Sequence, residues 1–326
     1  MKNFFSTVAL FATLAGIEAA SAQPFLSRPI TIIVPFPAGG GTDVTARIVS
    51  EHMSRTLGQR IVIENIAGAG GTTGSLRAMR ANPDGYTIEM GNMGTHSTAV
   101  ALYPTLDYRP DTDFAPIGLV HWAPVMMVAR KGFPPENLKE FISYLNASAQ
   151  KLNMAHAGVG SIGFSCGLLF NSIVGAKPTL VPFNGAAPAI NALIGGQVDY
   201  MCDGGVINSV PHELSGRIKA YLIDAERRSP ILPNVPTARE AGLPEFKASA
   251  WTALFAPRGT PKLVLDTLTD ALELALDDDQ TRKRLLELAT EIPDTADRGQ
   301  QPLAALVRRE ITRWSAIISA AAVKAE

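Results

Sequence analysis

The chain has 326 residues, of which 46% are hydrophobic and 18% are charged, so it can bury more than one compact core. Its 29 basic and 30 acidic residues give a formal net charge of -1. This balance excludes the basic surface of a nucleic-acid-binding protein and an electrostatic membrane anchor, and it favours a small-molecule partner.

The N-terminus is typical of a cleaved export signal. Lys2 precedes an apolar stretch over residues 4–17, and Ala20-Ser21-Ala22 supplies small residues ahead of Gln23. The stretch is shorter than the roughly 20 apolar residues that span a bilayer, which disfavours an anchoring helix. We therefore expect residues 1–22 to be removed and the mature protein to be periplasmic.

Export changes how the two cysteines are interpreted. Cys166 and Cys202 would lie in an oxidising compartment, where a pair tends to form a disulfide, and two buried free thiols are the alternative. Neither cysteine has a second cysteine or a histidine at ligand spacing, and the histidines are scattered along the chain. We therefore predict neither a metal site nor a cofactor.

From residue 30 onward, short β-branched runs alternate with helical patterns, which is typical of βαβ units. Helices are predicted at 44–57 and 75–81. A sheet covered by helices on both faces follows from this alternation. The predicted strands are 30–34, 61–64, 86–90, 125–129, 152–155, 179–181, 198–202 and 219–222.

The rest of the chain predicts a crossing segment and a helical end. Three prolines in 229–236 exclude a helix or a central strand there. A strand is predicted at 249–256, then a helix that starts near Pro261 and carries leucines at three- and four-residue spacing, and a last helix at 303–322. An exported α/β chain with such a crossover suggests a bilobed receptor whose ligand meets the loops after the strands.

The first such loop is "VPFPAGGGTD", residues 34–43. Successive glycines let several N–H groups point at one anion, and the following helix adds its free N–H groups and the positive end of its dipole. Residues 35–43 contain no basic side chain, which favours directional binding of a carboxylate. A simple tight turn is the alternative. Asp43 either meets a cationic or hydroxyl part of a ligand or, with Thr42, caps the helix.

The second loop, residues 157–167, matches a dinucleotide fingerprint at Gly158, Gly160 and Gly163. No Asp or Glu follows before residue 198 to hold a ribose, so we reject a dinucleotide site. A loop that binds a ligand through amides and hydroxyls suits its glycine and serine content.

The same loop matches the G-x-S-x-G nucleophile elbow of α/β-hydrolases around Ser165. The strand is predicted to end near His156, which leaves too long a loop before the serine. The one later histidine, His212, follows closely on two aspartates, which fits a catalytic triad badly. A secreted serine hydrolase that uses Ser165 therefore remains the weaker alternative.

Two further loops carry glycines. Asp203 ends a predicted strand and either hydrogen-bonds the ligand or caps the turn of Gly204 and Gly205. A Cys166–Cys202 bridge would tie this loop to the second loop and reduce the ordering cost of binding. Residues 68–75 form another glycine run without the lysine of a P-loop, and they either line the first lobe or allow close packing.

Taken together, these stretches resemble the periplasmic solute-binding proteins of tripartite tricarboxylate transporters, the Bug-type receptor family. The resemblance covers almost the whole mature chain. It rests on "IIVPFPAGGGTDVTAR" (32–47), "IVIENIAGAGG" (61–71), "NPDGYTI" (82–88), "DFAPIGLV" (113–120), "VPFNGAAPAINALIGGQVDYM" (181–201), "NVPTAREAGLPEF" (234–246) and "APRGTP" (256–261).

The resemblance implies a non-enzymatic α/β receptor with a periplasmic-binding-protein-like (type II) Venus-flytrap fold, two lobes, a cleft and hinge crossovers. We expect residues 23–123 plus 235–326 to form lobe 1 and residues 124–234 to form lobe 2. The resemblance also implies that loops 35–43 and 158–165 grip a ligand carboxylate through amides, hydroxyls and water. The implied contacts are Phe36, Ala38, Gly39, Gly40 and Ser161, followed by Asp43, Gly160 and Asp203.

Delivery to the membrane permease subunits of a tripartite tricarboxylate transporter follows from the same resemblance, and we expect a monomer. The ligand stays open among di- and tricarboxylates, aromatic acids, nicotinate-like acids and acidic amino acids. Because the loops lack basic residues, we expect a mono- or dicarboxylate to bind better than citrate.

Overall fold

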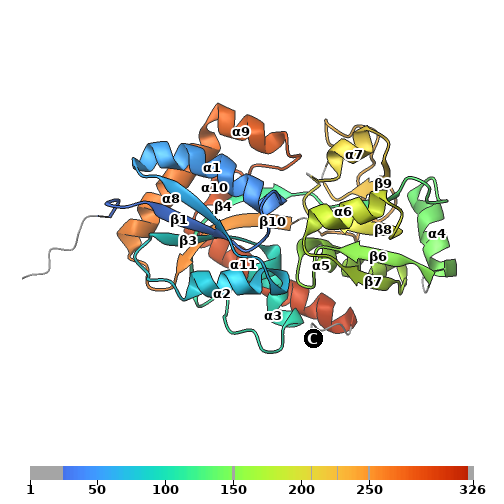
Figure 1. Cartoon of the computed structure of the whole chain (residues 1–326), viewed down its shortest axis with the longest axis horizontal. Coiled ribbons are helices and arrows are strands. Elements are labelled where there is room, and N and C mark those ends of the chain that lie inside the picture. The colour runs from blue at the N-terminus through green and yellow to red at the C-terminus, as the bar shows by residue number, and fades with distance from the viewer. Residues whose placement is uncertain (1–24, 149–150, 207, 226, 249, 322–326) are drawn as a thin grey trace, which may run out of the picture.

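The computed structural model describes residues 25–148, 151–206, 208–225, 227–248 and 250–321. The predicted export signal, residues 1–22, lies outside these residues. The described chain forms two α/β lobes that lie side by side, each built on a five-stranded sheet (Figure 1).

Lobe 1 has the strand order β2-β1-β3-β10-β4. Its strands are β1 (Ile30–Val34), β2 (Ile61–Asn65), β3 (Thr87–Asn92), β4 (Phe114–Ala123) and β10 (Ala250–Pro257). β1 runs parallel to β2 and β3, whereas β10 runs antiparallel to β3 and β4. Its helices are α1 (Gly41–Leu57), α2 (Thr72–Met79), α3 (Ala99–Leu102), α8 (Lys262–Asp277), α9 (Asp279–Leu286), α10 (Thr295–Arg298) and α11 (Gln300–Ala321), with the short turns η1 (Ala69–Gly71) and η2 (Gly94–Thr98).

Lobe 2 has the strand order β7-β6-β8-β5-β9, with β6 parallel to β7 and β8 and with β5 antiparallel to β8 and β9. Its strands are β5 (Met126–Arg130), β6 (Asn153–His156), β7 (Thr179–Pro182), β8 (Tyr200–Asp203) and β9 (Ile218–Ile223). Its helices are α4 (Leu138–Ser148), α5 (Ile162–Val174), α6 (Ala186–Ile194) and α7 (Val210–Leu214).

The apolar runs bury both faces of the first sheet, as the sequence predicts. Ile32 on β1 belongs to the core beneath α1 and α8, whereas its neighbour Ile33 belongs to a second core that continues into lobe 2. The leucine spacing of α8 places Leu268, Leu272 and Leu276 in the first core. Full burial of each such side chain contributes roughly 1.5–3 kcal/mol.

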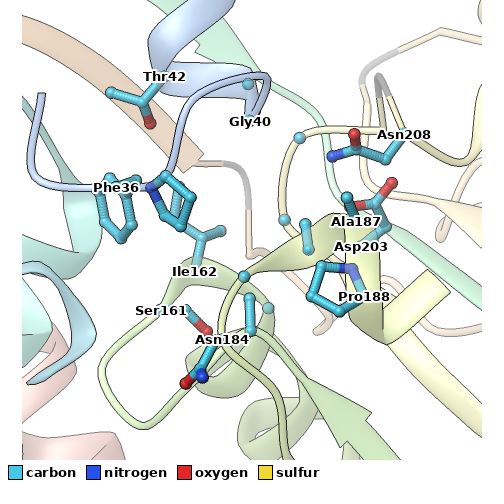
Figure 2. A pocket seen from close by; sticks show the side chains of 18 of the residues that line it. Phe36, Gly40, Thr42, Ser161, Ile162, Asn184, Ala187, Pro188, Asp203 and Asn208 are labelled. Atoms are coloured by element: carbon cyan, nitrogen blue, oxygen red, sulfur yellow. The ribbon is translucent and has the colours of Figure 1, made fainter. Parts of the chain in front are cut away.

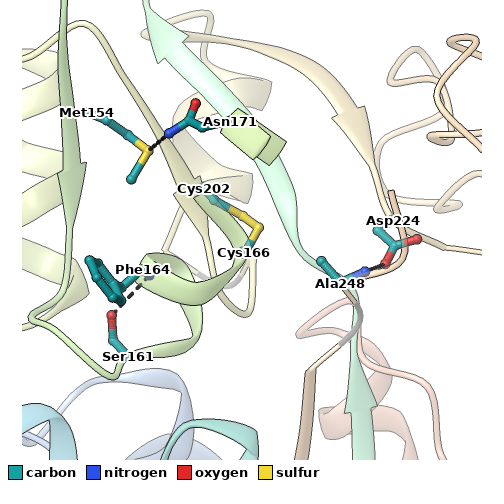
Figure 3. Close-up of a disulfide and its surroundings, with 8 residues drawn as sticks. All are labelled: Met154, Ser161, Phe164, Cys166, Asn171, Cys202, Asp224 and Ala248. Atoms are coloured by element: carbon teal, nitrogen blue, oxygen red, sulfur yellow. Dashed lines mark hydrogen bonds between the residues drawn. A yellow bond between two sulfur atoms is a disulfide. The ribbon is translucent and has the colours of Figure 1, made fainter. Parts of the chain in front are cut away.

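The chain crosses between the lobes along two adjacent segments. The first crossing joins β4 to β5 through residues 124–125, and the return follows β9 and passes through the proline-rich segment, which contains no named helix or strand in the described part. The Ala248 N–H donates a hydrogen bond to the Asp224 carboxylate, which lies where the chain leaves β9 (Figure 3). The two crossings form the hinge, while the predicted lobe boundaries stay a prediction.

Two features differ from the expectations. β4 is not among the predicted strands, because Pro116 and Gly118 interrupt its pattern; the structure accommodates them where the β10–β4 register shifts. α1 begins at Gly41 rather than at residue 44, which brings the glycine loop to the first turn of the helix. None of the helices in the described part of the chain is long and apolar enough to cross a membrane.

Candidate functional site

A cavity of about 190 Å³ lies between the lobes. This volume is below the roughly 300 Å³ at which pockets for drug-sized ligands begin, so it suits a small molecule. Figure 2 shows Phe36 and Thr42 of lobe 1 on one side and Ala187, Pro188 and Asp203 of lobe 2 on the other.

The first wall of the cavity is the N-terminus of α1. Gly40 is the N-cap residue and provides no side-chain cap, while Gly41 and Thr42 line the cavity. The N–H groups of these two residues make no hydrogen bond within the described part of the chain. Unpaired N–H groups at a helix start, together with the helix dipole, attract an anion.

Asp43 holds this loop in shape. Its carboxylate accepts hydrogen bonds from the Gly39 N–H at 2.8 Å, from Arg47 at 2.9 and 3.0 Å, and from the Asn65 amide at 3.0 Å. Burial alone would raise the pKa of Asp43, but the hydrogen bonds from Arg47, Gly39 and Asn65 together lower it. Asp43 is therefore ionised, and its carboxylate is held by donors from the loop, from α1 and from the end of β2.

The second wall is the N-terminus of α5. Ser161 is its N-cap, and the serine Oγ accepts a hydrogen bond from the Phe164 N–H at 3.2 Å, so the hydroxyl proton remains available for donation. Ser161, Ile162 and Gly163 line the cavity. The N–H groups of Ile162 and Gly163 have no hydrogen-bond partner among the described residues.

The third wall is the N-terminus of α6, which we did not single out from the sequence. Its N-cap, Gly185, has φ of 118° and no side-chain cap, and Ala186 and Ala187 line the cavity. Their N–H groups are likewise unpaired within the described chain. Pro188 follows at the third helical position, where a missing N–H costs little. The sequence signal was a glycine directly before a helical run, which also occurs before α1.

Among the described residues that line the cavity, one side chain, that of Asp203, is ionisable. Its carboxyl accepts hydrogen bonds from the N–H and the hydroxyl of Ser209. Burial raises the pKa of Asp203, and the Ser209 hydrogen bonds only partly offset this. A raised pKa weakens the repulsion that Asp203 would exert on a bound anion, because it favours the neutral acid.

The other polar groups at the cavity are uncharged, and no Lys, Arg or His lines it within the described part of the chain. The Thr42 hydroxyl oxygen lies 3.3 Å from the Asn92 amide nitrogen, which donates to it, so the hydroxyl proton is free to point elsewhere. Asn184 and Asn208 add side-chain amides. The cavity therefore offers neutral N–H and O–H donors in place of a cationic side chain.

The predicted disulfide between Cys166 and Cys202 is present (Figure 3). It joins the second turn of α5 to β8, directly before Asp203. The α5 wall is therefore covalently tied to the strand that ends in Asp203.

The structure separates the predicted contacts into two groups. Phe36, Ala38, Gly40, Ser161 and Asp203 line the cavity. Gly39, Asp43 and Gly160 do not: Gly39 donates its N–H to Asp43, and the Gly160 carbonyl faces Gly94 of lobe 1.

The alternative nucleophile, Ser165, lies inside α5 and not on a strand-to-helix turn. Its Oγ is buried without a hydrogen-bond partner in the described chain, so no base is placed to activate it. Gly158 and Gly160 take positive φ and shape a loop that contacts lobe 1, and no acidic residue follows before residue 198 to hold the ribose of a dinucleotide.

A wider space, about 900 Å³, adjoins the cavity beyond Phe36 and Asn184. The glycine run at residues 68–71 lines it, together with Tyr103 and His156. Residues 68–71 therefore line this space on the side of lobe 1, which agrees with one of the two interpretations of the glycine run.

The chain matches the model of the family described as "Tripartite tricarboxylate transporter family receptor" over residues 45–323. MatC of Rhodopseudomonas palustris, solved with bound malate, is 49% identical with a TM-score of 0.86, covering 90% of this chain and 99% of that chain. The periplasmic binding protein BugD is 39% identical with a TM-score of 0.86, covering 92% of this chain and 99% of that chain.

Among curated relatives, an Agrobacterium vitis UPF0065 protein from the TAR-I ttuE-ttuC' intergenic region is 37% identical over 322 residues, which is 98% of this chain and 92% of that protein. The predicted fold class is confirmed by these comparisons and by the two mixed sheets.

Proposed function

The chain belongs to the receptor family of tripartite tricarboxylate transporters, and on that premise we propose that it captures a small organic carboxylate between its lobes for delivery to the permease subunits of such a transporter. The observation that carries this proposal is the convergence on one cavity of three helix N-termini, those of α1, α5 and α6, each with two N–H groups that are unpaired within the described chain.

A carboxylate suits this arrangement for electrostatic reasons. Each helix start contributes about 0.3–1 kcal/mol of favourable interaction with an anion, and up to about 2 kcal/mol where the site is partly buried. Hydrogen bonds to a charged group add roughly 1.5–3 kcal/mol each. Three helix starts with unpaired N–H pairs can therefore hold one carboxylate without Arg or Lys.

The same reasoning limits the charge of the ligand. The cavity has no cationic side chain to neutralise further carboxylates, and Asp203 would repel them once ionised. A dicarboxylate is favoured over citrate. Malate is the leading candidate, because the structure of MatC holds malate and MatC is 49% identical to this chain.

We assign the ligand contacts to Phe36, Ala38, Gly40, Ser161 and Asp203, together with the N–H groups at the three helix starts. Gly39, Asp43 and Gly160 act indirectly, by shaping the loops that present those donors. The lobes close on the ligand by rotation about the two crossings, and closure supplies the contacts that distinguish the liganded form.

We further propose that residues 1–22 are a cleaved signal, that the mature receptor is a periplasmic monomer, and that its lobes divide at residues 123–124 and 234–235. These proposals rest on the apolar N-terminal pattern and on the placement of the crossings. The serine hydrolase alternative has no supporting geometry.

Isothermal titration of the mature chain, residues 23–326, with malate, succinate, citrate, benzoate, nicotinate and aspartate tests the function. We expect a dicarboxylate to bind without turnover and to raise the melting temperature. Ala187→Phe, which fills the cavity, should abolish binding, whereas Ala147→Phe on the exposed face of α4 should not. Failure of every acid to bind, or binding that survives Ala187→Phe, would overturn the proposal.

A further inference from the structure

A smaller cavity of about 30 Å³ adjoins the carboxylate cavity. The two share Gly41, Thr42, Ile162, Gly204 and Gly205 as lining residues. We call the smaller one the hinge annex, because the end of β4 and the start of β10, which carry the two crossings, also line it. Its remaining lining residues are Thr45, His121, Ala123, Thr252, Leu288 and Thr290.

The polar side chains of the hinge annex are buried and incompletely hydrogen-bonded. Thr45 Oγ1 lies 3.0 Å from His121 Nε2, while His121 Nδ1 has no hydrogen-bond partner in the described chain although the residue is only 4% exposed. Thr252, the register partner of His121 on β10, is 3% exposed. Because a buried polar group without a partner is costly, His121 Nδ1 marks a place where a polar guest binds favourably.

Thr290 adds a directional constraint. Its hydroxyl donates to the Leu285 carbonyl at 2.7 Å, so towards the annex it can only accept. A guest that both donates and accepts hydrogen bonds would complement the Thr252, Thr290 and His121 groups together. A hydroxyl has this double capacity.

The charge state of the annex selects against a carboxylate. Burial lowers the pKa of His121 to about 4, with the Trp122 backbone acting weakly in the opposite direction, so the imidazole is neutral near neutral pH. No Lys, Arg, Asp or Glu of the described residues lines the annex. An ionised group would lose its hydration there without a counter-charge, whereas an uncharged group pays no such penalty.

The volume of the hinge annex also favours a group of the size of a hydroxyl. A cavity of this kind needs roughly 10–15 Å³ to hold one water molecule, so about 30 Å³ accommodates a water or a hydroxyl-bearing carbon but no larger group. Because the two cavities share five lining residues, they are adjacent, and one small ligand can reach both.

We propose that the hinge annex is a hydroxyl-recognition subsite, in which Thr45, His121 and Thr252 bind the hydroxyl of a hydroxy-dicarboxylate. The inference rests on the proposed function and extends it: the α1, α5 and α6 N-termini fix a carboxylate, and the annex distinguishes a hydroxylated acid from its unsubstituted counterpart. Thr45 holds His121 in position, and Thr252 contacts the hydroxyl.

Titration of the mature protein with each malate enantiomer and with succinate tests this subsite, because these acids differ by one hydroxyl. We expect one malate enantiomer to bind roughly tenfold more tightly than succinate, the factor that one net hydrogen bond supplies. Equal affinities would overturn the subsite while leaving the carboxylate receptor intact. Binding of none of the three would overturn both.

Thr252→Val and Thr45→Val remove one hydroxyl each with little change in volume. Each should reduce the preference for malate over succinate about five- to tenfold, with succinate affinity unchanged. Thr56→Val, on the exposed face of α1, is the matched control and should leave the ratio unaltered. Melting temperatures verify folding, and since the two variants lie on different elements, an unfolded one leaves the other to decide. An equal loss of affinity for both acids in the folded variants would contradict the proposal.

Discussion

Tyr103 of lobe 1 donates a 2.6 Å hydrogen bond to the carbonyl oxygen of Val159 in lobe 2. The loop around Val159 leads directly into Ser161 and the start of α5, so the contact that joins the lobes also positions a wall of the cavity. Gly70 and Gly94 of lobe 1 provide the space for this loop, since a side chain at either would meet the carbonyl of Val159 or Gly160. In the described conformation the lobes therefore meet at this loop, so the proposed closure can be tested at a few identifiable contacts.

The first prediction concerns the hydroxyl of Tyr103. Tyr103→Phe should weaken dicarboxylate binding roughly three- to tenfold, because the closed form loses one net hydrogen bond of about 0.5–1.5 kcal/mol. Titration calorimetry measures the loss. Tyr144→Phe in α4 is the control, because the Tyr144 hydroxyl makes no hydrogen bond among the described residues. Unchanged affinity in Tyr103→Phe would show that this contact does not stabilise the closed form.

The second prediction concerns the glycine beneath Val159. A Cβ added at Gly70 would overlap the Val159 carbonyl oxygen and lie 2.7 Å from the Tyr103 hydroxyl. Gly70→Ala should therefore reduce affinity by at least about tenfold, by more than Tyr103→Phe, because it obstructs closure sterically. Small-angle scattering with saturating ligand should show a more open molecule.

Gly58→Ala is the matched control. Gly58 has φ of 62° and Gly70 has φ of 64°, but an added Cβ at Gly58 meets nothing within 4 Å. Both substitutions cost about 1–2 kcal/mol of backbone strain. Similar losses of affinity in the two variants would attribute the effect to general destabilisation instead of blocked closure.

The third prediction concerns the disulfide. Cys166 and Cys202 are 36 residues apart in sequence, so replacing both with Ala should lower the free energy of unfolding by about 3–4 kcal/mol. Denaturant unfolding measures this value. Dithiothreitol should lower the unfolding midpoint of the parent protein and leave the double variant unaffected. A reductant effect of equal size in both would mean that the bridge is not its cause.

The fourth prediction concerns a carboxyl inside lobe 1. Burial raises the pKa of Glu89 to about 8, with the Ser75 hydroxyl, 2.6 Å away, acting in the opposite direction. Burial also lowers the pKa of the neighbouring His96 to about 3, so both groups are neutral at pH 7. Glu89 keeps its proton in the folded state between its ordinary value of 4.5 and about 8, whereas the unfolded chain has lost it.

Glu89 should therefore contribute a loss of stability as the pH rises from about 4.5 to about 8, by roughly 1.4 kcal/mol per unit at most. Below about pH 6.5 the buried, neutral His96 and His121 act in the opposite direction, so the loss should be seen in the parent protein between about pH 6.5 and 8. Glu89→Gln should remove that dependence and unfold at higher urea concentration at pH 8 than the parent. Exposed Glu64→Gln serves as the control. Parallel pH profiles of Glu89→Gln and the parent would contradict the buried, protonated state.

Local pattern predicted most of the fold because β-branched runs and leucine spacing report burial directly. β1 begins and ends where the sequence predicts, and the other predicted strands that lie fully within the described chain agree to within two residues at each end. β4 was not predicted because its stability comes from pairing with β10, a strand far away in sequence. Register shifts in this pairing accommodate Pro116 and Gly118.

The site was predicted less completely, for a different reason. The glycine loop before α1 and Ser161 carry recognisable local signals, whereas the α6 start offers the cavity mainly backbone N–H groups and has no distinctive side chain apart from Asn184. The role of Asp43 was also beyond sequence reasoning, because its partners Gly39, Arg47 and Asn65 meet only in the folded lobe. In the hinge annex, Thr45 and His121 lie 76 positions apart in the sequence, so no local pattern indicates that they meet.

The most direct measurement is a crystal structure of the mature protein with bound malate. The account predicts one malate carboxylate within hydrogen-bond distance of the N–H groups of Gly41 or Thr42, Ile162 or Gly163, and Ala186 or Ala187, with no Lys or Arg side chain in contact with it. A malate carboxylate held by Arg or Lys at another place on the protein, away from all three helix starts, would contradict it.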